Sequence, residues 1–376
     1  MVFTIEILNM KKRLLLAVCF VFAASFLTVN AITRPVWGTF VKPSDPAIQY
    51  VGRINFTNPD RPLFVYPGIQ ITANFSGTSL RMMAKPESGY FMAQVDDGMP
   101  FKVAFRGKQD SIVTLATALP KGEHRICLNY CIEGYELRPE FWGFWLDEGC
   151  SLLPPTPLPQ RRIEFIGNSI TCGYGNESLS REEHYSYETQ NHYYSYAART
   201  ARALNAQYIA VARSGIGIYR NYGGPKTGNA DNMPAEYPFT CYHDKSQRWD
   251  FSRFTPQVVC LNLGTNDTST GICDKKKLIE AYGDFYNTLR GHYPGAKIVL
   301  LTGSMLNGKE LETVKEALDT VAAEAKKKGD NEVYRFDMSP QDGSLMMGAD
   351  WHPSYWQHEK MANELTAFLR SLMKWF

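Results

Sequence analysis

Residues 163–176 read Ile-Glu-Phe-Ile-Gly-Asn-Ser-Ile-Thr-Cys-Gly-Tyr-Gly-Asn. The short apolar run Ile163–Ile166 predicts a buried strand that ends at a glycine. Ser169 follows where this strand gives way to a helix. Free backbone N–H groups at such a helix N-terminus favour negative charge on a nearby oxygen. The setting suits the nucleophile of an acyl-transfer reaction, but it also suits a serine that merely caps a helix.

After residue 160, predicted strands alternate with predicted helices. The strands are Ile163–Ile166, Gln207–Ala212, Val258–Leu263, Lys297–Leu301 and Val333–Asp337. The helices lie near Tyr193–Leu204, Lys276–His292, Lys309–Lys328 and Pro353–Met373, with Pro353 expected in the first turn of the last one. This alternation predicts a parallel sheet wrapped by helices. In such folds the reactive groups gather outside the carboxyl ends of the strands.

Residues 32–150 read differently, as short strands between turns with no long amphipathic helix. The predicted strands include Ile48–Phe56, Leu63–Phe75, Leu80–Ala84, Tyr90–Val95, Phe101–Phe105, Ile112–Ala118, His124–Cys131 and Phe141–Leu146. Asp96-Asp97-Gly98 predicts a hairpin turn. We expect an all-β sandwich of the jelly-roll kind, which either binds sugar or supports its neighbour. Residues 151–160 contain four prolines and mark the linker to the second domain, residues 161–376.

The N-terminus has the three parts of a secretory signal. Lys11, Lys12 and Arg13 precede the apolar stretch Leu14–Leu27, and Val29-Asn30-Ala31 ends it with small residues. The apolar run is too short for a stable membrane span. We expect a signal peptide over residues 1–31 and a secreted or periplasmic protein. Cys19 leaves lipoprotein anchoring as a less favoured alternative.

Composition sets further bounds. A chain of 376 residues favours two domains, and 44% hydrophobic with 21% charged residues is typical of globular proteins. Net charge is +2, with no basic run beyond the N-terminus, which argues against nucleic acid as a partner. Seven cysteines remain after residue 31, in spacings that fit no common zinc pattern, and their disulfide pairing stays open. We expect a monomer with no metal and no cofactor.

Three other blocks follow predicted strands or open the last helix. Gly215 lies in Arg213-Ser214-Gly215-Ile216-Gly217, Asn266 in Leu263-Gly264-Thr265-Asn266-Asp267, and His352 in Asp350-Trp351-His352-Pro353. A glycine lets a substrate oxygen approach a backbone N–H, and an asparagine amide can donate to an oxyanion. A histidine can take the serine proton, with an aspartate to orient it. Taken singly, each of these residues could have a purely structural role. All of them follow a predicted strand or open a helix, and this common placement is the reason to treat them as one site.

Together the four blocks resemble the SGNH (GDSL) hydrolase superfamily, from Ile163 to the C-terminus. The closer resemblance is to carbohydrate esterase family 2, carried by Gly167–Gly175, Ser214–Gly223, Trp249–Pro256 and Gly264–Asp267. Members of that family have a jelly roll before the hydrolase domain, so the resemblance covers nearly the whole mature chain. It implies a flavodoxin-like three-layer α/β/α domain. One departure is Asn168, where the superfamily usually has Asp.

The resemblance also implies roles. Ser169 would be the nucleophile and His352 the general base and acid. The backbone N–H groups of Ser169 and Gly215, with the Asn266 side chain, would form the oxyanion hole. Asp350 matches the acid that orients the histidine, although some family members use a backbone carbonyl instead.

The implied function is that of a secreted acetyl xylan esterase-like enzyme, which removes O-acetyl groups from plant polysaccharides such as xylan or glucomannan. Its partner would be the acetylated polysaccharide or oligosaccharide. Trp351, Tyr174, Tyr219 and Tyr222 lie near the four blocks and are candidates to flank a sugar ring, with core packing as the alternative. Two other functions stay open: a carbohydrate-binding protein with little activity, and a lipid or thioester acyl hydrolase on the same fold.

Overall fold

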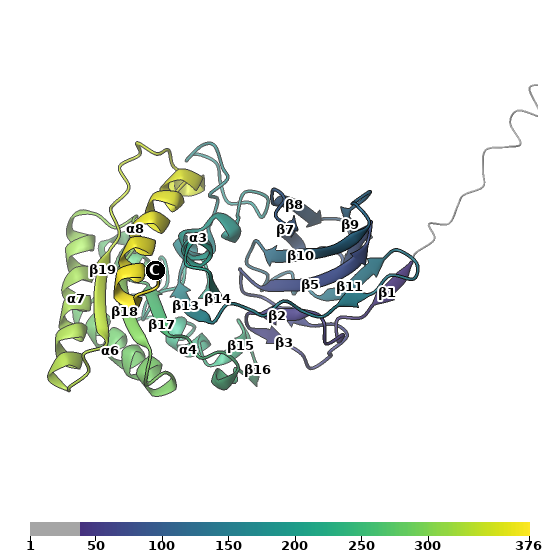
Figure 1. Cartoon of the computed structure of the whole chain (residues 1–376). Coiled ribbons are helices and arrows are strands. Elements are labelled where there is room, and N and C mark those ends of the chain that lie inside the picture. Colours follow the sequence, from purple (N-terminus) through teal and green to yellow (C-terminus); the bar gives the residue numbers. More distant parts are fainter. Residues whose placement is uncertain (1–37) are drawn as a thin grey trace, which may run out of the picture. The chain divides into compact units, whose positions relative to one another are not determined.

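The structure, a computed structural model, describes residues 38–376, so the predicted signal peptide lies outside the described residues. Residues Thr39–Phe376 form one compact unit. Antiparallel strands fill its N-terminal part, and parallel strands with helices fill the remainder (Figure 1).

The N-terminal part contains two larger antiparallel sheets and a two-stranded pair, β3-β4. One of the larger sheets has the order β1-β11-β6-β9, and the other has the order β12-β5-β10-β7-β8 with β2 paired to β5. Their inward side chains make one apolar core, as in a β-sandwich. The strands are β1 Thr39–Val41, β2 Gln49–Val51, β3 Ile54–Asn55, β4 Leu63–Phe64, β5 Gln70–Gly77, β6 Leu80–Ala84, β7 Gly89–Val95, β8 Phe101–Phe105, β9 Ile112–Ala116, β10 Gly122–Tyr130, β11 Phe141–Leu146 and β12 Leu152–Leu153.

Two predicted strands of this part are wrong. Ile48–Phe56 was expected to be continuous, but it is divided into β2, which pairs with β5, and β3, which pairs with β4. Leu63–Phe75 was also expected to be continuous, but it is divided into β4, which pairs with β3, and β5, which pairs with β10. Pro67-Gly68 forms a turn between them, and Gly68 has a φ of 76°. Proline cannot donate to a sheet ladder and glycine accepts a positive φ, so this pair ends one strand before the next begins. The predicted hairpin at Asp96-Asp97-Gly98 is confirmed, because it joins β7 to its antiparallel partner β8.

The C-terminal part is built on a five-stranded sheet with the order β14-β13-β17-β18-β19, in which every neighbouring pair is parallel. The first strand lies between the second and the third, which is the flavodoxin-like order. The strands are β13 Arg161–Gly167, β14 Ala206–Ala212, β17 Val258–Asn262, β18 Lys297–Thr302 and β19 Val333–Asp337. A small antiparallel pair, β15 Phe239–Cys241 and β16 Asp244–Arg248, lies outside this sheet.

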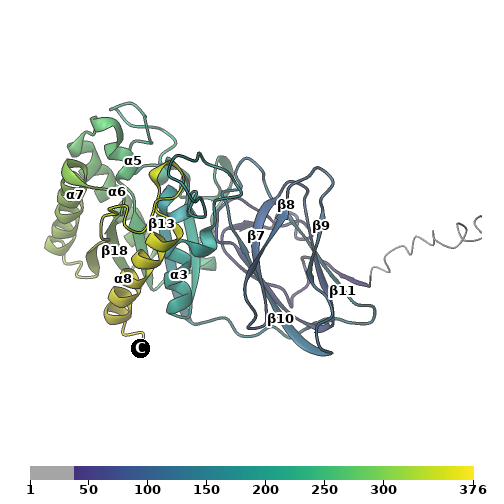
Figure 2. The ribbon, with the colours of Figure 1, turned by 90° about the horizontal axis from the view of Figure 1, so that it is seen from above.

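Helices cover both faces of the parallel sheet, which confirms the predicted three layers (Figures 1 and 2). Side chains of α3 and α8 share one apolar core with Phe165 and Val299, and side chains of α6 and α7 share another with Ile166 and Leu300. The helices are α2 Ser169–Cys172, α3 Tyr196–Ala203, α4 Met233–Glu236, α5 Thr265–Thr268, α6 Lys275–His292, α7 Gly308–Lys327 and α8 Tyr355–Met373, with short 3-10 turns η1 His192–Tyr194, η2 Phe251–Arg253, η3 Ser269–Gly271 and η4 Ala349–Trp351.

Helix α8 begins later than predicted. Pro353 was expected in its first turn, but Ser354 is the N-cap, and its side chain accepts from the Gln357 N–H. Serine satisfies a free N–H of the first turn better than the residues around it, so it sets the boundary. Pro353 therefore precedes the helix and belongs to the segment that carries His352.

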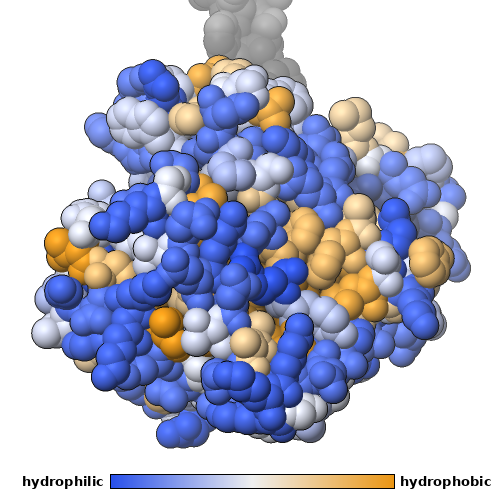
Figure 3. All heavy atoms as spheres, turned by 90° about the vertical axis from the view of Figure 1, so that its left-hand side faces the viewer, coloured by the Kyte–Doolittle hydropathy of each residue, from blue (hydrophilic) through white to orange (hydrophobic). Residues whose placement is uncertain are grey.

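The outer surfaces follow from this packing. The apolar residues of α7 face the sheet and its charged residues face outward, and the side of the molecule that carries α7 is mostly hydrophilic (Figure 3). Within residues 38–376 no helix combines the length and the apolar character needed to cross a membrane. The seven cysteines of these residues are all free thiols.

A buried ion pair joins the two parts of the unit. Arg53, in the N-terminal part, donates from Nη2 to Oε1 of Glu164 in β13 at 3.2 Å, and both side chains are fully buried. The Glu164 Oε2 accepts from the Tyr237 hydroxyl at 2.9 Å. Each buried charge thus has a partner from a distant segment.

Candidate active site

Ser169 is the first residue of α2, which begins immediately beyond β13. The turn brings Thr171 so close to Gly167 that any side chain at residue 167 would collide with it. Only glycine therefore fits at this position. Asn168 is the N-cap, and its Oδ1 accepts from the Ile170 N–H at 3.0 Å. The departure from Asp therefore keeps the capping hydrogen bond and omits the charge.

The structure brings His352 to Ser169 from 183 residues away in the sequence. The His352 Nε2 lies 2.9 Å from the Ser169 Oγ. On the other side of the ring, Nδ1 lies 3.1 Å from the Ala349 carbonyl and 3.2 Å from the Asp350 carbonyl. Carbonyl oxygens only accept, so the proton is on Nδ1 and the Nε2 lone pair accepts from the Ser169 hydroxyl. Burial lowers the pKa of His352 to about 4, against the opposing effect of the two carbonyls.

The Asp350 carboxylate does not orient His352 directly, which corrects the role expected for it. Its Oδ1 bonds to Nδ1 of His184 at 2.8 Å, and its Oδ2 accepts from the Tyr174 hydroxyl at 2.7 Å and the Tyr185 N–H at 3.1 Å. The group that faces the His352 ring is the Asp350 main-chain carbonyl. The carboxylate instead ties the His352 segment to the loop that follows α2.

The backbone of that segment explains this arrangement. Asp350 and Trp351 both adopt left-handed conformations, with φ of 48° and 59°. This region is unfavourable for residues with a side chain, and such strain is usually found at functional sites. The turn aims the carbonyls of residues 349 and 350 at the imidazole. It also leaves the Asp350 side chain free to face the opposite direction.

Two of the three candidate oxyanion donors, Gly215 and Asn266, line the same cavity as His352. Gly215 has a φ of 78°, and a side chain built on it would meet nothing closer than 4.0 Å. Its conformation, rather than lack of room, therefore requires glycine. Asn266, in α5, donates one amide N–H to the Ile216 carbonyl at 2.7 Å. An amide NH₂ carries a second hydrogen, which is available to a substrate oxygen.

One cavity of about 590 Å³ holds these groups together. That volume is in the usual range for small-molecule sites. Its lining contains Ser169, Tyr174, Gly215, Tyr222, Asn266, Asp350, Trp351 and His352 from the predicted site and its candidate aromatics, together with Ser214, Thr265, Ser269 and Met305.

The candidate aromatic residues divide into two groups. Trp351 is 50% exposed and Tyr222 is 69% exposed at the cavity wall, so both offer a ring to a ligand. The Tyr174 ring stacks on His352 with centroids 4.0 Å apart. Tyr219 was predicted to contact substrate, but it is only 6% exposed and packs in the core. Its hydroxyl accepts from the Asp274 N–H at 2.7 Å, so its role is structural.

Two supporting residues were not singled out from the sequence. The buried Asp267 carboxylate accepts from the N–H groups of Ile218, Tyr219 and Arg220 at 2.9–3.0 Å. It thereby fixes the chain that follows Gly215. Arg220 is fully buried and donates to the carbonyls of residues 266, 267 and 269. Arg220 and Asp267 are charged residues inside two of the predicted blocks, and this is the sequence signal that could have identified them. Charged side chains are rarely buried unless they are paired.

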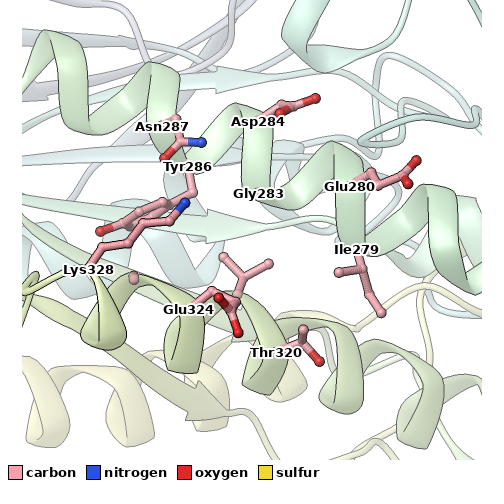
Figure 4. Close-up of a pocket in the computed structure, with 11 residues that line it drawn as sticks. Ile279, Glu280, Gly283, Asp284, Tyr286, Asn287, Thr320, Glu324 and Lys328 are labelled. Carbon is pink, nitrogen blue, oxygen red and sulfur yellow. The ribbon is translucent and has the colours of Figure 1, made fainter.

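Other parts of the described chain offer less chemistry. A hollow of about 230 Å³ between α6 and α7 is lined by Glu280, Tyr286, Thr320, Glu324 and neighbouring residues (Figure 4). It contains none of the predicted site residues. Within residues 38–376 no three His, Cys, Asp or Glu side chains gather in a way that could hold a metal ion.

Two family models match the chain. The model described as "Carbohydrate esterase 2 N-terminal" matches residues 50–156. The model described as "GDSL-like Lipase/Acylhydrolase family" matches residues 165–360. The first falls on the antiparallel sheets and the second on the parallel sheet with its helices.

Relatives and solved structures agree with these matches. The chain is 32% identical over 336 residues to an "Acetylxylan esterase / glucomannan deacetylase" of Cellvibrio japonicus, covering 88% of this chain and 90% of the relative. It is 39% identical to "Cellulase/esterase CelE" of Acetivibrio thermocellus, covering 88% of this chain but only 40% of that longer protein. A family two carbohydrate esterase from Clostridium thermocellum, solved in complex with cellohexaose, superposes with a TM-score of 0.81 at 39% identity, covering 88% of this chain and 100% of the other. By sequence and by fold alike, this chain belongs to carbohydrate esterase family 2, a family of carboxylic ester hydrolases within the GDSL-like group.

Proposed function

We propose that this protein is a serine esterase that removes O-acetyl groups from polysaccharides. The observation that carries the proposal is the 2.9 Å contact between Ser169 Oγ and His352 Nε2, in a cavity also lined by Gly215 and Asn266. A hydroxyl, a base and oxyanion donors around one space are what ester hydrolysis through an acyl-enzyme needs.

In the first step Ser169 Oγ attacks the ester carbonyl carbon while its proton moves to His352 Nε2. The resulting imidazolium keeps its Nδ1–H against the carbonyls of residues 349 and 350. These carbonyl dipoles stabilise the positive charge that the ring gains. The tetrahedral oxyanion accepts from the N–H groups of Ser169 and Gly215 and from the Asn266 amide.

The tetrahedral intermediate then collapses: the bond between the carbonyl carbon and the sugar oxygen breaks, His352 gives its proton to that oxygen, the sugar leaves as an alcohol, and the acetyl group stays on Ser169. Water then attacks this acyl-enzyme with His352 as general base. Acetate leaves and Ser169 regains its proton. The same imidazole acts as base and acid in turn, so no further titratable group is required.

Two observations support a polysaccharide as the substrate: the aromatic residues at the cavity rim and the names of the relatives. Trp351 and Tyr222 expose aromatic faces beside the nucleophile, and flat rings suit the apolar faces of sugars. The Cellvibrio japonicus relative carries acetylxylan and glucomannan in its name, and acetylated forms of these are the substrates we propose. We further propose that residues 1–31 direct export, which would place the enzyme where plant polysaccharides are found.

The direct test is acetate release from acetylated xylan, glucomannan and cellulose-derived oligosaccharides, with wild type beside Ser169→Ala. We expect release by the wild type and near-complete loss in the variant. Equal release by both proteins would end the assignment of Ser169. Saccharide binding without acetate release would favour the carbohydrate-binding alternative. Faster hydrolysis of octanoyl than acetyl esters would favour the lipid acyl hydrolase.

A further inference from the structure

A buried carboxylate from the N-terminal part lies beside the loop that carries Gly215. Glu133 follows β10 and is only 4% exposed. Its Oε1 accepts from the Ser214 N–H at 2.6 Å, and its Oε2 accepts from the Ser214 hydroxyl at 2.5 Å. Both donors of the residue before Gly215 are therefore held by one side chain.

The same carboxylate also reaches the end of the helix that begins with Ser169. Gln190 donates from Nε2 to Glu133 Oε2 at 3.3 Å, and the same nitrogen lies 3.4 Å from the Cys172 carbonyl. Burial raises the pKa of Glu133, while the Ser214 donors oppose that rise. An ionised carboxylate is acceptor-only and satisfies all of these donors together.

Glu133 itself is rigidly placed. The main chain on one side is fixed by the Cys131 carbonyl, which accepts from the His192 N–H at 2.8 Å. On the other side the Gly134 N–H donates to the Val65 carbonyl at 2.8 Å. The backbone that carries Glu133 is thus fixed by contacts with both parts of the chain, and its two carboxylate oxygens accept from the loop of the parallel-sheet part.

We propose that Glu133 is a positioning residue for the oxyanion hole, which fixes Ser214 so that the Gly215 N–H faces the substrate carbonyl. The proposal rests on the proposed esterase function. Gly215 has no side chain to restrict it, and glycine samples left- and right-handed backbone conformations about equally. Holding the preceding residue at both N–H and hydroxyl removes that freedom. The N-terminal part of the chain thereby contributes to catalysis without touching the substrate.

Glu133→Gln is the informative change, because it keeps the shape but replaces one acceptor oxygen by an NH₂. That NH₂ must face either the Ser214 N–H or the position where the carboxylate accepts from both the Ser214 hydroxyl and Gln190 Nε2. A whole oxyanion donor is worth ~10²–10³ in turnover. We expect the misaligned Gly215 N–H to lower kcat about 10- to 100-fold, with KM changed less than about 3-fold. The matched control is Glu164→Gln. Glu164 is also a buried carboxylate that bonds across the two parts of the chain, but its partner is Arg53, which holds no residue of the oxyanion hole.

The experiment measures kcat per active site, with sites counted by the initial burst from para-nitrophenyl acetate. It also measures inhibition by a small boronic acid, whose tetrahedral adduct mimics the oxyanion, and by a deacetylated oligosaccharide. In Glu133→Gln, boronate affinity should fall by about the same factor as kcat, while oligosaccharide affinity stays unchanged. In Glu164→Gln, stability to urea should fall while kcat per site and boronate affinity stay at the wild-type values.

Wild-type kcat per site and wild-type boronate affinity in Glu133→Gln would overturn the proposal, even if the variant were less stable. If Glu133→Gln does not fold, Ser214→Ala decides, because it removes only the hydroxyl contact. A smaller loss in kcat and in boronate affinity supports the proposal, and no change in either overturns it. Failure of the esterase function itself is recognised separately, as wild-type protein with no Ser169-dependent burst.

Discussion

The imidazole of His352 is held by two main-chain carbonyls, and the neighbouring carboxylate of Asp350 serves a different part of the site. Main-chain acceptors cannot be protonated at ordinary pH, so they fix the tautomer without adding a titratable charge. The strained φ angles of residues 350 and 351 are what make this geometry possible. Two consequences follow at the scale of single residues.

Asp350→Asn should retain most of the activity. Loss of an aspartate that directly orients a catalytic histidine lowers kcat by ~10⁴, whereas here the carboxylate bonds to Tyr174, His184 and the Tyr185 N–H. We expect kcat to fall less than about 10-fold, through a looser loop, when measured with para-nitrophenyl acetate. A loss of ~10³ or more in a protein with wild-type stability to urea would show that the carboxylate acts on the imidazole after all.

The pH dependence of kcat/KM should report the lowered pKa of His352. The base works only when neutral, and burial lowers its pKa from 6.5 to about 4. The neutral form is therefore present above that value and is lost as pH falls through it. We expect a flat profile from neutral pH down to about pH 5 and a fall near pH 4. Enzyme returned to neutral pH should regain full activity, and an acidic limb centred near 6.5 would contradict the account.

At the scale of elements, the loop after β14 is shaped by α5. Asp267 accepts main-chain N–H groups from residues 218, 219 and 220, and one more from Gly264 in its own turn. Burial raises the pKa of this carboxylate, and the N–H groups of residues 218, 219 and 220 oppose the rise. The donors of two separate segments therefore converge on one side chain beside Asn266.

Asp267→Asn should weaken both stability and catalysis. An amide presents one acceptor oxygen, so at least one buried N–H loses its partner, at a cost of about 1–3 kcal/mol. The loosened loop begins at Gly215, so we also expect kcat to fall by about 10-fold. Urea unfolding gives the first quantity and initial rates give the second. A variant with wild-type stability would mean that the carboxylate charge contributes little.

Elements were predictable where one pattern dominates the local sequence. β19 is found as predicted at Val333–Asp337, and α6 begins one residue earlier than expected. The prediction of one continuous strand over Leu63–Phe75 was wrong because the turn signal Pro67-Gly68 was overlooked. Tyr219 and Asp350 failed for another reason: the direction of a side chain depends on tertiary contacts, here the core around Cys273 and the strained turn before His352. A residue next to a motif in the sequence can be expected near the site, but the direction of its side chain cannot be predicted from the sequence.

At the scale of the whole molecule, the sandwich and the parallel-sheet part share buried polar contacts. Arg53 is fully buried and donates to Glu164, to the Tyr237 carbonyl and to the Phe239 carbonyl. A buried ion pair is weak evidence for net stabilisation, but removing one partner leaves an uncompensated charge. The pair therefore favours the packing of the two parts in which Arg53 and Glu164 are in contact.

Arg53→Met should destabilise the protein by about 3–5 kcal/mol, because Glu164 stays buried without its cation. The loss should appear in urea unfolding, while kcat per titrated site stays at the wild-type value, since Arg53 does not line the cavity. The double variant Arg53→Met with Glu164→Leu should recover part of the loss, because no charge is then buried. A single variant as stable as wild type would show that water reaches the pair.

If Ser169 is the nucleophile, its hydroxyl oxygen becomes acetylated during turnover. The most direct measurement is acid quench of the enzyme during the burst with para-nitrophenyl acetate, followed by mass spectrometry of its peptides. We expect one acetyl group on the peptide that contains Ser169 and none on the same peptide of Ser169→Ala. An acetyl group on another residue, with turnover preserved in Ser169→Ala, would contradict it.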